Sequence, residues 1–174
     1  RISREKKYLT AAKNAHRFLQ EHLWDGDQLY VSYRNGKRGV AGFLDDYAAG
    51  IFATLSLYGA TLESDCLEQA KRLCKSALSR FEDPTDSGLY LYAKDSEGLI
   101  LRPKETYDGA IPSGNSLMAY NLVRLWQFTN DQQDHARAER QLEFLAAEAA
   151  QYPAGFSMYL SALLEYQEPS LKVT

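Results

Sequence analysis

Three short stretches of the chain concentrate the side chains that could carry out chemistry. They are residues 42–47, 105–116 and 153–159, and each lies at the start of a nearly uncharged segment. Together they supply carboxylates, a hydroxyl and an amide from Asp45, Asp46, Glu105, Asp108, Ser113 and Asn115, with Tyr30, Tyr47, Tyr107 and Tyr159 among them. If the fold brings these stretches together, we expect a polar site lined by aromatic rings.

Paired carboxylates are what glycoside hydrolysis needs, because one group donates a proton and the other acts as base or nucleophile. Tyrosine suits the same purpose, since its ring packs on the apolar face of a sugar while its hydroxyl offers a hydrogen bond. We therefore expect Asp45 and Asp46 to serve as acid/base or hydroxyl-binding groups. The expected ligand-binding residues are Tyr47, Glu105, Tyr107, Asp108, Ser113, Gly114 and Asn115.

The same residues have a structural interpretation. Asp45 and Asp46 fall in the first turn of an expected helix, where the helix dipole stabilises an acid that has no catalytic task. Ser113 and Asn115 can cap the next helix, with Pro112 setting its entry. Ligand contact and capping therefore both stay open.

Other chemistries find little support. His16, His22 and His135 lie on or near polar helical faces, which favours surface or packing roles over that of a base. Their spacing matches no zinc pattern, and the chain has no Gly-rich phosphate loop or nucleophile elbow. Cys66 and Cys74 are eight residues apart on one expected helix, or about 12 Å, which is too far for a disulfide. We expect no metal, no cofactor and no thiol chemistry.

Composition limits the possible partners and location. The 174 residues are 45% hydrophobic and carry a net charge of -3, which fits one soluble domain or part of a larger one. No basic stripe indicates nucleic acid, and no run of about 18 apolar residues could cross a membrane. The polar start lacks the apolar core of a secretory signal, so we expect a cytoplasmic protein. Because the first residue is Arg1 rather than Met, we expect a fragment of a longer chain.

The expected elements that position the site are helices of two kinds. Amphipathic segments at 5–23, 63–82 and 132–150 hold twenty charged residues in 58 positions, whereas 43–60, 114–129 and 155–166 hold four in 46. A helix that is apolar all round must be surrounded by protein. The alternation predicts three α-hairpins, with charged outer helices around an uncharged inner layer.

The connections differ in length. Residues 25–37 and 86–98 each contain a short alternating run and a Gly-containing turn, which predicts two small β-hairpins, while 151–155 is a tight link. All the long loops leave from the side where the inner helices begin. Loops of this kind tend to carry function.

Two motifs in this chain resemble a known family. Phe43-Leu44-Asp45-Asp46-Tyr47-Ala48 and, further on, Tyr107-Asp108-Gly109-Ala110-Ile111-Pro112-Ser113-Gly114-Asn115-Ser116 are similar to the helical part of thioredoxin-domain-containing proteins of the spermatogenesis-associated type. The resemblance implies an all-α (α/α)6 toroid, similar to six-hairpin glycosidases and N-acylglucosamine 2-epimerases. Residues 1–174 would form one segment of it, with three helical hairpins and small β-hairpin insertions.

The resemblance also implies a function and its limits. Carbohydrate binding or processing at the N-termini of the inner helices is the leading expectation. The alternative is a non-catalytic helical scaffold that supports a thioredoxin-like domain or a protein partner. The thioredoxin-like domain is absent and no histidine matches the epimerase catalytic histidines. About half of a twelve-helix ring would expose apolar ends, which self-association or the missing remainder of the toroid must cover.

Overall fold

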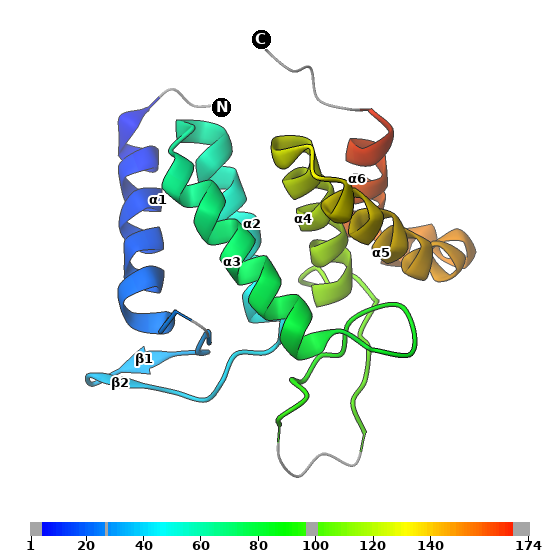
Figure 1. Ribbon diagram of the computed structural model, residues 1–174, viewed down its shortest axis with the longest axis horizontal. Coiled ribbons are helices and arrows are strands. Elements are labelled where there is room, and N and C mark those ends of the chain that lie inside the picture. The colour runs from blue at the N-terminus through cyan, green and yellow to red at the C-terminus, as the bar shows by residue number, and fades with distance from the viewer. Residues whose placement is uncertain (1–4, 27, 97–100, 169–174) are drawn as a thin grey trace.

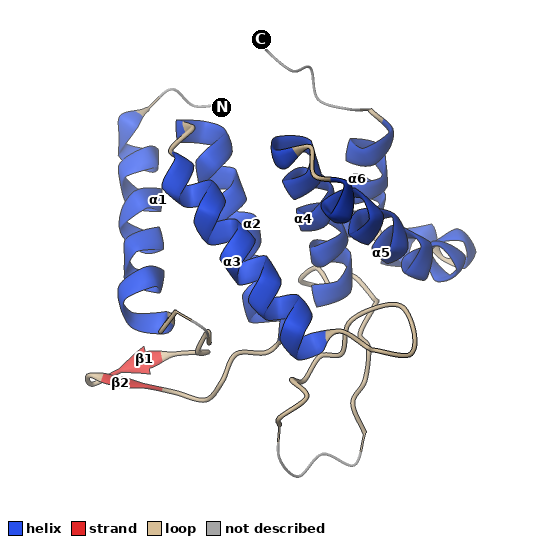
Figure 2. Ribbon diagram, in the orientation of Figure 1, coloured by secondary structure: helices blue, strands red, loops and turns tan. Residues whose placement is uncertain are grey.

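The computed structural model describes residues 5–26, 28–96 and 101–168. Figure 2 shows that helices dominate these ranges, so the expected all-α class is confirmed. The elements, in chain order, are α1 (Lys6–Phe18), the π-helical turn η1 (Leu19–Leu23), β1 (Tyr33–Arg34), β2 (Lys37–Arg38), α2 (Leu44–Thr61), α3 (Ser64–Phe81), α4 (Gly114–Thr129), α5 (Gln132–Gln151), the 3-10 turn η2 (Pro153–Gly155) and α6 (Ser157–Gln167).

The helices form two layers in an open arc. Helix α4 packs between α2 and α6, and these three form the inner layer, while α3 covers α2 and α5 covers α4. Helix α1 flanks α2 at one end of the arc (Figure 1). The inner and outer helices are those that the charge pattern predicts. Five of the six lie within two residues of their expected bounds, and the first ends earlier, at the π-helical turn.

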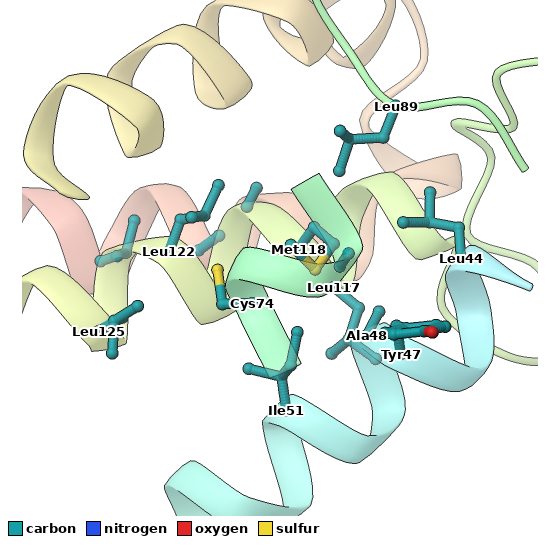
Figure 3. Close-up of a cluster of buried hydrophobic side chains, with 14 of the residues drawn as sticks. Leu44, Tyr47, Ala48, Ile51, Cys74, Leu89, Leu117, Met118, Leu122 and Leu125 are labelled. Carbon is teal, nitrogen blue, oxygen red and sulfur yellow. The ribbon is translucent and has the colours of Figure 1, made fainter. Parts of the chain in front are cut away.

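The core lies where the inner helices meet α3 and α5. Tyr47 and Ile51 of α2 and Met118 of α4 are fully buried members of one cluster (Figure 3). The Tyr47 ring meets the buried Phe81 ring of α3 edge-on, with centroids 5.3 Å apart. Helix α3 contributes one face, whose buried residues recur every three or four positions: Cys66, Ala70, Leu73, Cys74, Ala77 and Phe81. The apolar core thus fixes how the inner helices lie against one another.

Both ends of the arc expose apolar side chains. Helix α1 buries none of its residues, although Tyr8, Leu9 and Phe18 lie along it. A groove of about 770 Å³ separates α1 from the second half of α2. At the other end, Leu160 and Leu164 of α6 are exposed. An open arc of helices therefore leaves apolar surface at its ends, as expected from its helix number.

The connections follow the expectation in part. The hairpin β1–β2 forms, with Tyr33 opposite Arg38, and the link into α6 is a tight turn. A second hairpin over 86–98 is wrong for the described residues 86–96, which contain no strand. Instead, the Tyr90 and Lys94 N–H groups donate to the carbonyls of Phe81 and Arg80 at the end of α3. Those carbonyls lack intrahelical partners, so they compete with strand pairing.

Buried polar contacts fix the α3–α4 connection. Asp83 is almost fully buried and pairs with Lys104 at 2.8 Å, accepts a hydrogen bond from the Tyr90 hydroxyl at 2.6 Å, and binds the Thr85 N–H at 2.9 Å. Arg102 lies over the Tyr90 ring at 4.0 Å. These contacts hold both ends of the connection beside the C-terminus of α3, and so position the residues that lead into α4.

Asp83 should make the fold acid-sensitive. The bonds from Lys104 and then Tyr90 hold its pKa below the ordinary value of 3.8, so its stabilisation is present above pH 3.8 and is lost as the pH falls further. We expect Asp83→Asn to lower the melting temperature at pH 7 by a few degrees and to flatten its fall below pH 4. Circular dichroism melts from pH 2 to 7 measure this. Asp95→Asn, at an exposed ion pair with Arg80, is the matched control and should leave the curve unchanged.

Candidate functional site

The N-termini of the three inner helices meet on one face of the molecule. A Cβ atom on Gly114 would lie 2.4 Å from Asp45 Oδ1 and 2.8 Å from Leu44 Cγ, so α4 begins directly against the first turn of α2. Asp108 joins α4 to α6, because its Oδ1 accepts the Ser113 N–H at 2.9 Å and its Oδ2 accepts the Met158 N–H at 2.8 Å. The three polar stretches therefore converge, as expected. Figure 1 shows the α3–α4 connection and the hairpin at this edge, and the short α2–α3 and α4–α5 turns at the opposite one.

Asp45 is the carboxyl group with the unusual environment. Its Oδ1 is buried and has no hydrogen-bond partner among the described residues. Burial, followed by the negative charge of Glu105 and then that of Asp46, raises the pKa of Asp45 above its ordinary value of 3.8. The Gly114 N–H, at the start of α4, acts in the opposite direction. A raised pKa favours the protonated form of a carboxyl group, which is the form that donates a proton.

Asp46 is bound to its own helix. Its Oδ2 accepts the Phe43 N–H at 2.8 Å, which is the backward bond of a capping box at the start of α2. The two adjacent aspartates therefore differ in their contacts. Asp46 accepts a hydrogen bond from a backbone N–H, whereas one oxygen of Asp45 has no hydrogen-bond partner among the described residues.

Two of the expected ligand-binding residues are buried and bonded to protein. Tyr47 is fully buried, and its hydroxyl accepts the Leu29 N–H at 2.9 Å. Asn115 is also fully buried. Its amide nitrogen donates to the carbonyls of Leu89 and Glu105, and its oxygen accepts from the Leu89 N–H and the Gln141 amide. Asn115 thus ties two segments of the α3–α4 connection, at Leu89 and Glu105, to α4 and α5.

Ser113, Asp108 and Gly114 also make structural contacts. The Ser113 hydroxyl caps α4 by accepting the Ser116 N–H at 3.1 Å and donates to the Thr106 carbonyl at 3.0 Å. Asp108 caps α6 and bonds Ser113, as described above. These bonds are the capping contacts that the sequence analysis gives as an alternative to ligand binding. They also hold the residues of the site in place.

Glu105 and Tyr107 are the expected residues whose side chains are exposed. Glu105 lies near enough to Asp45 to raise its pKa. Tyr107 is 59% exposed, and its ring is parallel to that of Tyr152, with ring centroids 6.4 Å apart. The other two tyrosines are engaged elsewhere. Tyr159 is buried, and the Tyr30 hydroxyl donates to Asp25 at 2.8 Å.

Tyr152 is the residue that sequence analysis missed. Tyr152 is the C-cap of α5 and, like Tyr107, is more than half exposed. The sequence signal was the tight link Tyr152-Pro153-Ala154-Gly155, which holds an aromatic side chain between two helices. We treated that link as a connection only, because nothing local in the sequence pairs residue 152 with residue 107.

The described residues offer no site for a metal. No group of three or more His, Cys, Asp or Glu side chains there could hold an ion. The histidines lie apart from the site. His16 contacts Thr54 at 3.3 Å, and His135 contacts the Tyr166 hydroxyl at 3.1 Å. His22 stacks on Tyr33 with ring centroids 4.5 Å apart. Within the described ranges, no helix has both the length and the apolar character needed to span a membrane.

Comparison with curated proteins identifies relatives. The chain is 37% identical to spermatogenesis-associated protein 20 of Homo sapiens over an alignment of 134 residues that covers 71% of this chain. It is 29% identical over 144 residues to uncharacterized protein B0495.5 of Caenorhabditis elegans. The resemblance to the spermatogenesis-associated family is confirmed. The chain spans 17% and 20% of the lengths of these two relatives, and no protein-family model matches it.

Solved structures confirm the toroid fold. A family 76 glycoside hydrolase (mannosidase) from Bacteroides thetaiotaomicron superposes with a TM-score of 0.66 over 82% of this chain and 39% of its own, at 21% identity. Cellobiose 2-epimerase from Bacillus thermoamylovorans gives 0.64 over 80% and 38%, at 19% identity. At these identities the similarity establishes the fold: this relative of the spermatogenesis-associated family has the helical arc of six-hairpin toroids.

The adjacent aspartates should respond oppositely to substitution. At pH 7, Asp45→Asn removes a partly buried charge and should raise stability by up to about 1 kcal/mol, a modest figure because the side chain is not fully buried. The gain should fade as the pH falls through 3.8, because a group whose pKa is raised by folding costs stability only above its ordinary pKa. Asp46→Ala removes the bond to the Phe43 N–H and should lower stability by about 1 kcal/mol.

Urea unfolding of the two variants at pH 3.5 and pH 7 measures both effects. Because the substitutions are in neighbouring residues of one helical turn, each is the control for the other. Equal destabilisation by both would show that Asp45 is simply another capping acid.

Proposed function

We propose that the face where the inner helices begin binds and processes a carbohydrate in the cytoplasm, with Asp45 as its acid. The observation that carries this proposal is the state of Asp45, a carboxyl group with a raised pKa and a buried oxygen without a partner. Active sites are where such perturbed groups concentrate. The unbonded thiols of Cys66 and Cys74, both buried, fit a reducing compartment.

The chemistry would divide between two carboxyl groups. Asp45 donates its proton to the oxygen that leaves as the glycosidic C–O bond breaks. Glu105, an exposed acid close enough to influence Asp45, takes the proton of the attacking water or attacks the sugar carbon itself. Asp46 stays with the α2 cap. The toroid fold is compatible with this role, since its solved neighbours include a mannosidase and an epimerase.

Turnover of simple glycosides tests the proposal. We expect the chain to bind or slowly cleave disaccharides such as mannobiose or cellobiose, and Asp45→Asn to reduce turnover by about 100-fold or more, since general acid catalysis contributes about 10²–10⁴-fold. Glu105→Gln should have a similar effect, and Asp46→Asn, which keeps an oxygen for the Phe43 N–H, should have little. Calorimetry and a reducing-sugar assay give the two readouts. Absence of both binding and cleavage across a panel of neutral disaccharides contradicts the proposal.

A helical scaffold is the second candidate, and the α1–α2 groove favours it. The groove is lined by apolar side chains such as Leu9, Phe52 and Leu57, with Glu5 and Lys6 at its rim. A second copy of the chain related by two-fold symmetry could cover its apolar lining. In this alternative, the site residues act only as caps and ties.

Self-association tests the second candidate. Sedimentation velocity should show a dimer at concentrations of tens of micromolar, on the order of the affinity of small interfaces, and Leu9→Glu in the groove should abolish it. Leu62→Glu is the matched control, because Leu62 is 73% exposed and does not line the groove. A wild-type chain that stays monomeric at every concentration excludes a second copy of the chain as the occupant of the groove.

A further inference from the structure

Tyr107 and Tyr152 come from connections that are far apart in the sequence, yet their rings are parallel to within 1° with centroids 6.4 Å apart. Both rings are more than half exposed. Exposed single aromatic side chains are common on protein surfaces, but a matched, parallel pair is not explained by packing. The pair therefore needs a reason beyond the stability of the fold.

The backbone that carries Tyr107 is fixed on both sides. The Thr106 hydroxyl donates to Glu148 of α5 at 2.7 Å, and the Asp108 N–H donates to the Gly155 carbonyl at 2.8 Å. Asp108 also accepts the Met158 N–H at the start of α6. Tyr107 is thus held between two anchored neighbours while its own side chain remains in solvent. This combination is typical of binding residues on a rigid support.

The backbone that carries Tyr152 is equally constrained. Its N–H donates to the Glu148 carbonyl at 3.0 Å, so it completes the last turn of α5, and Pro153 follows it directly. Glu148 therefore holds both tyrosines, through its side chain on one side and its carbonyl on the other. These bonds fix the relative position of the two backbone segments from which the rings project.

Gly155 shows how closely the pair is arranged. A Cβ atom at this position would lie 2.6 Å from Cε2 of Tyr107 and 2.7 Å from Cδ1 of Tyr152. Both contacts are far shorter than van der Waals distance, so any other residue would displace at least one ring. Its backbone torsion is not left-handed, so the need for glycine here comes from the two rings and not from backbone strain.

The surrounding charge limits the ligand. Glu105 precedes Tyr107 by two residues and Glu148 bonds Thr106, so carboxylates flank the rings. The nearby Lys104 is engaged by Asp83 and Asp86. A phosphorylated or acidic sugar would be repelled by this surface. A neutral pyranose, whose C–H face stacks on aromatic rings, meets no such repulsion.

We propose that Tyr107 and Tyr152 form an aromatic platform, supported by Gly155, that binds neutral oligosaccharides of two or more pyranose units on the face where the inner helices begin. This inference rests on the proposed carbohydrate function and gives it a substrate class. Each of the two parallel rings offers an apolar face, and the ring centroids are 6.4 Å apart, so two linked pyranose units can contact both rings. A disaccharide therefore gains contacts that a monosaccharide cannot make, and the platform favours chains over single sugars.

Calorimetric titration of the chain with mannobiose, cellobiose, mannose and mannose 6-phosphate tests the platform. We expect a neutral disaccharide to bind at least about tenfold more tightly than mannose, and mannose 6-phosphate not to bind. Tyr107→Ala and Tyr152→Ala should each weaken disaccharide binding about tenfold. Tyr152→Phe, which keeps the ring, should bind nearly as well as the wild type.

Two further variants distinguish weaker binding caused by loss of the platform from weaker binding caused by general damage to the fold. Tyr8→Ala removes a tyrosine of matching exposure, 58%, on α1 and should leave binding unchanged. Gly155→Ala keeps both tyrosines but displaces a ring, so it should weaken binding while far-UV circular dichroism stays that of the wild type.

The outcomes distinguish this inference from the function on which it rests. If disaccharides bind and the tyrosine variants bind equally well, the platform is overturned while the proposed function stands. If no sugar binds to the wild-type chain, the proposed function fails and the platform with it. If Asp45→Asn abolishes turnover while binding still depends on both rings, both are supported.

Discussion

The close approach of α4 to α2 at Gly114 is the constraint on which the rest of the site depends. Only a residue without a side chain lets the first turn of α4 lie against Leu44 and Asp45. That contact brings two helix N-termini to one place and traps the Asp45 carboxyl between them. Positive helix ends favour a nearby carboxylate, whereas burial and Glu105 disfavour it, and the second influence prevails in the raised pKa. Opposing electrostatic influences therefore act on the Asp45 carboxyl group.

Buried polar groups elsewhere on this face do the work of support. Asn115 binds two segments of the α3–α4 connection, and Asp108 joins α4 to α6. Each is fully bonded to protein, as buried polar groups must be to avoid a large desolvation penalty. The exposed groups, Glu105, Tyr107 and Tyr152, then project from a backbone that is hydrogen-bonded to neighbouring elements. This division between bonded support and exposed contact residues is how a rigid binding site is built.

The layers of the fold could be predicted from charge alone. Uncharged segments became α2, α4 and α6, because an apolar helix has to be covered on every side. The second hairpin could not be predicted correctly, since its backbone donors bind the open carbonyls of Phe81 and Arg80, a tertiary contact without a local pattern. The roles of Asn115 and Tyr47 stayed open for the same reason. Their partners, such as Gln141 and Leu29, lie 26 and 18 residues away. Tyr152 was missed because its pairing with Tyr107 spans an entire helical hairpin.

The account stands or falls with the ionisation of Asp45. A carboxyl-carbon NMR titration of the folded chain, with the Asp45 resonance assigned by its loss in Asp45→Asn, measures that pKa directly. The account predicts a value clearly above 3.8, reached without unfolding and lowered when Glu105 is replaced by glutamine. A value at or below 3.8 would mean that the helix ends hold Asp45 ionised, as in an ordinary cap, and would remove the acid from the proposed site.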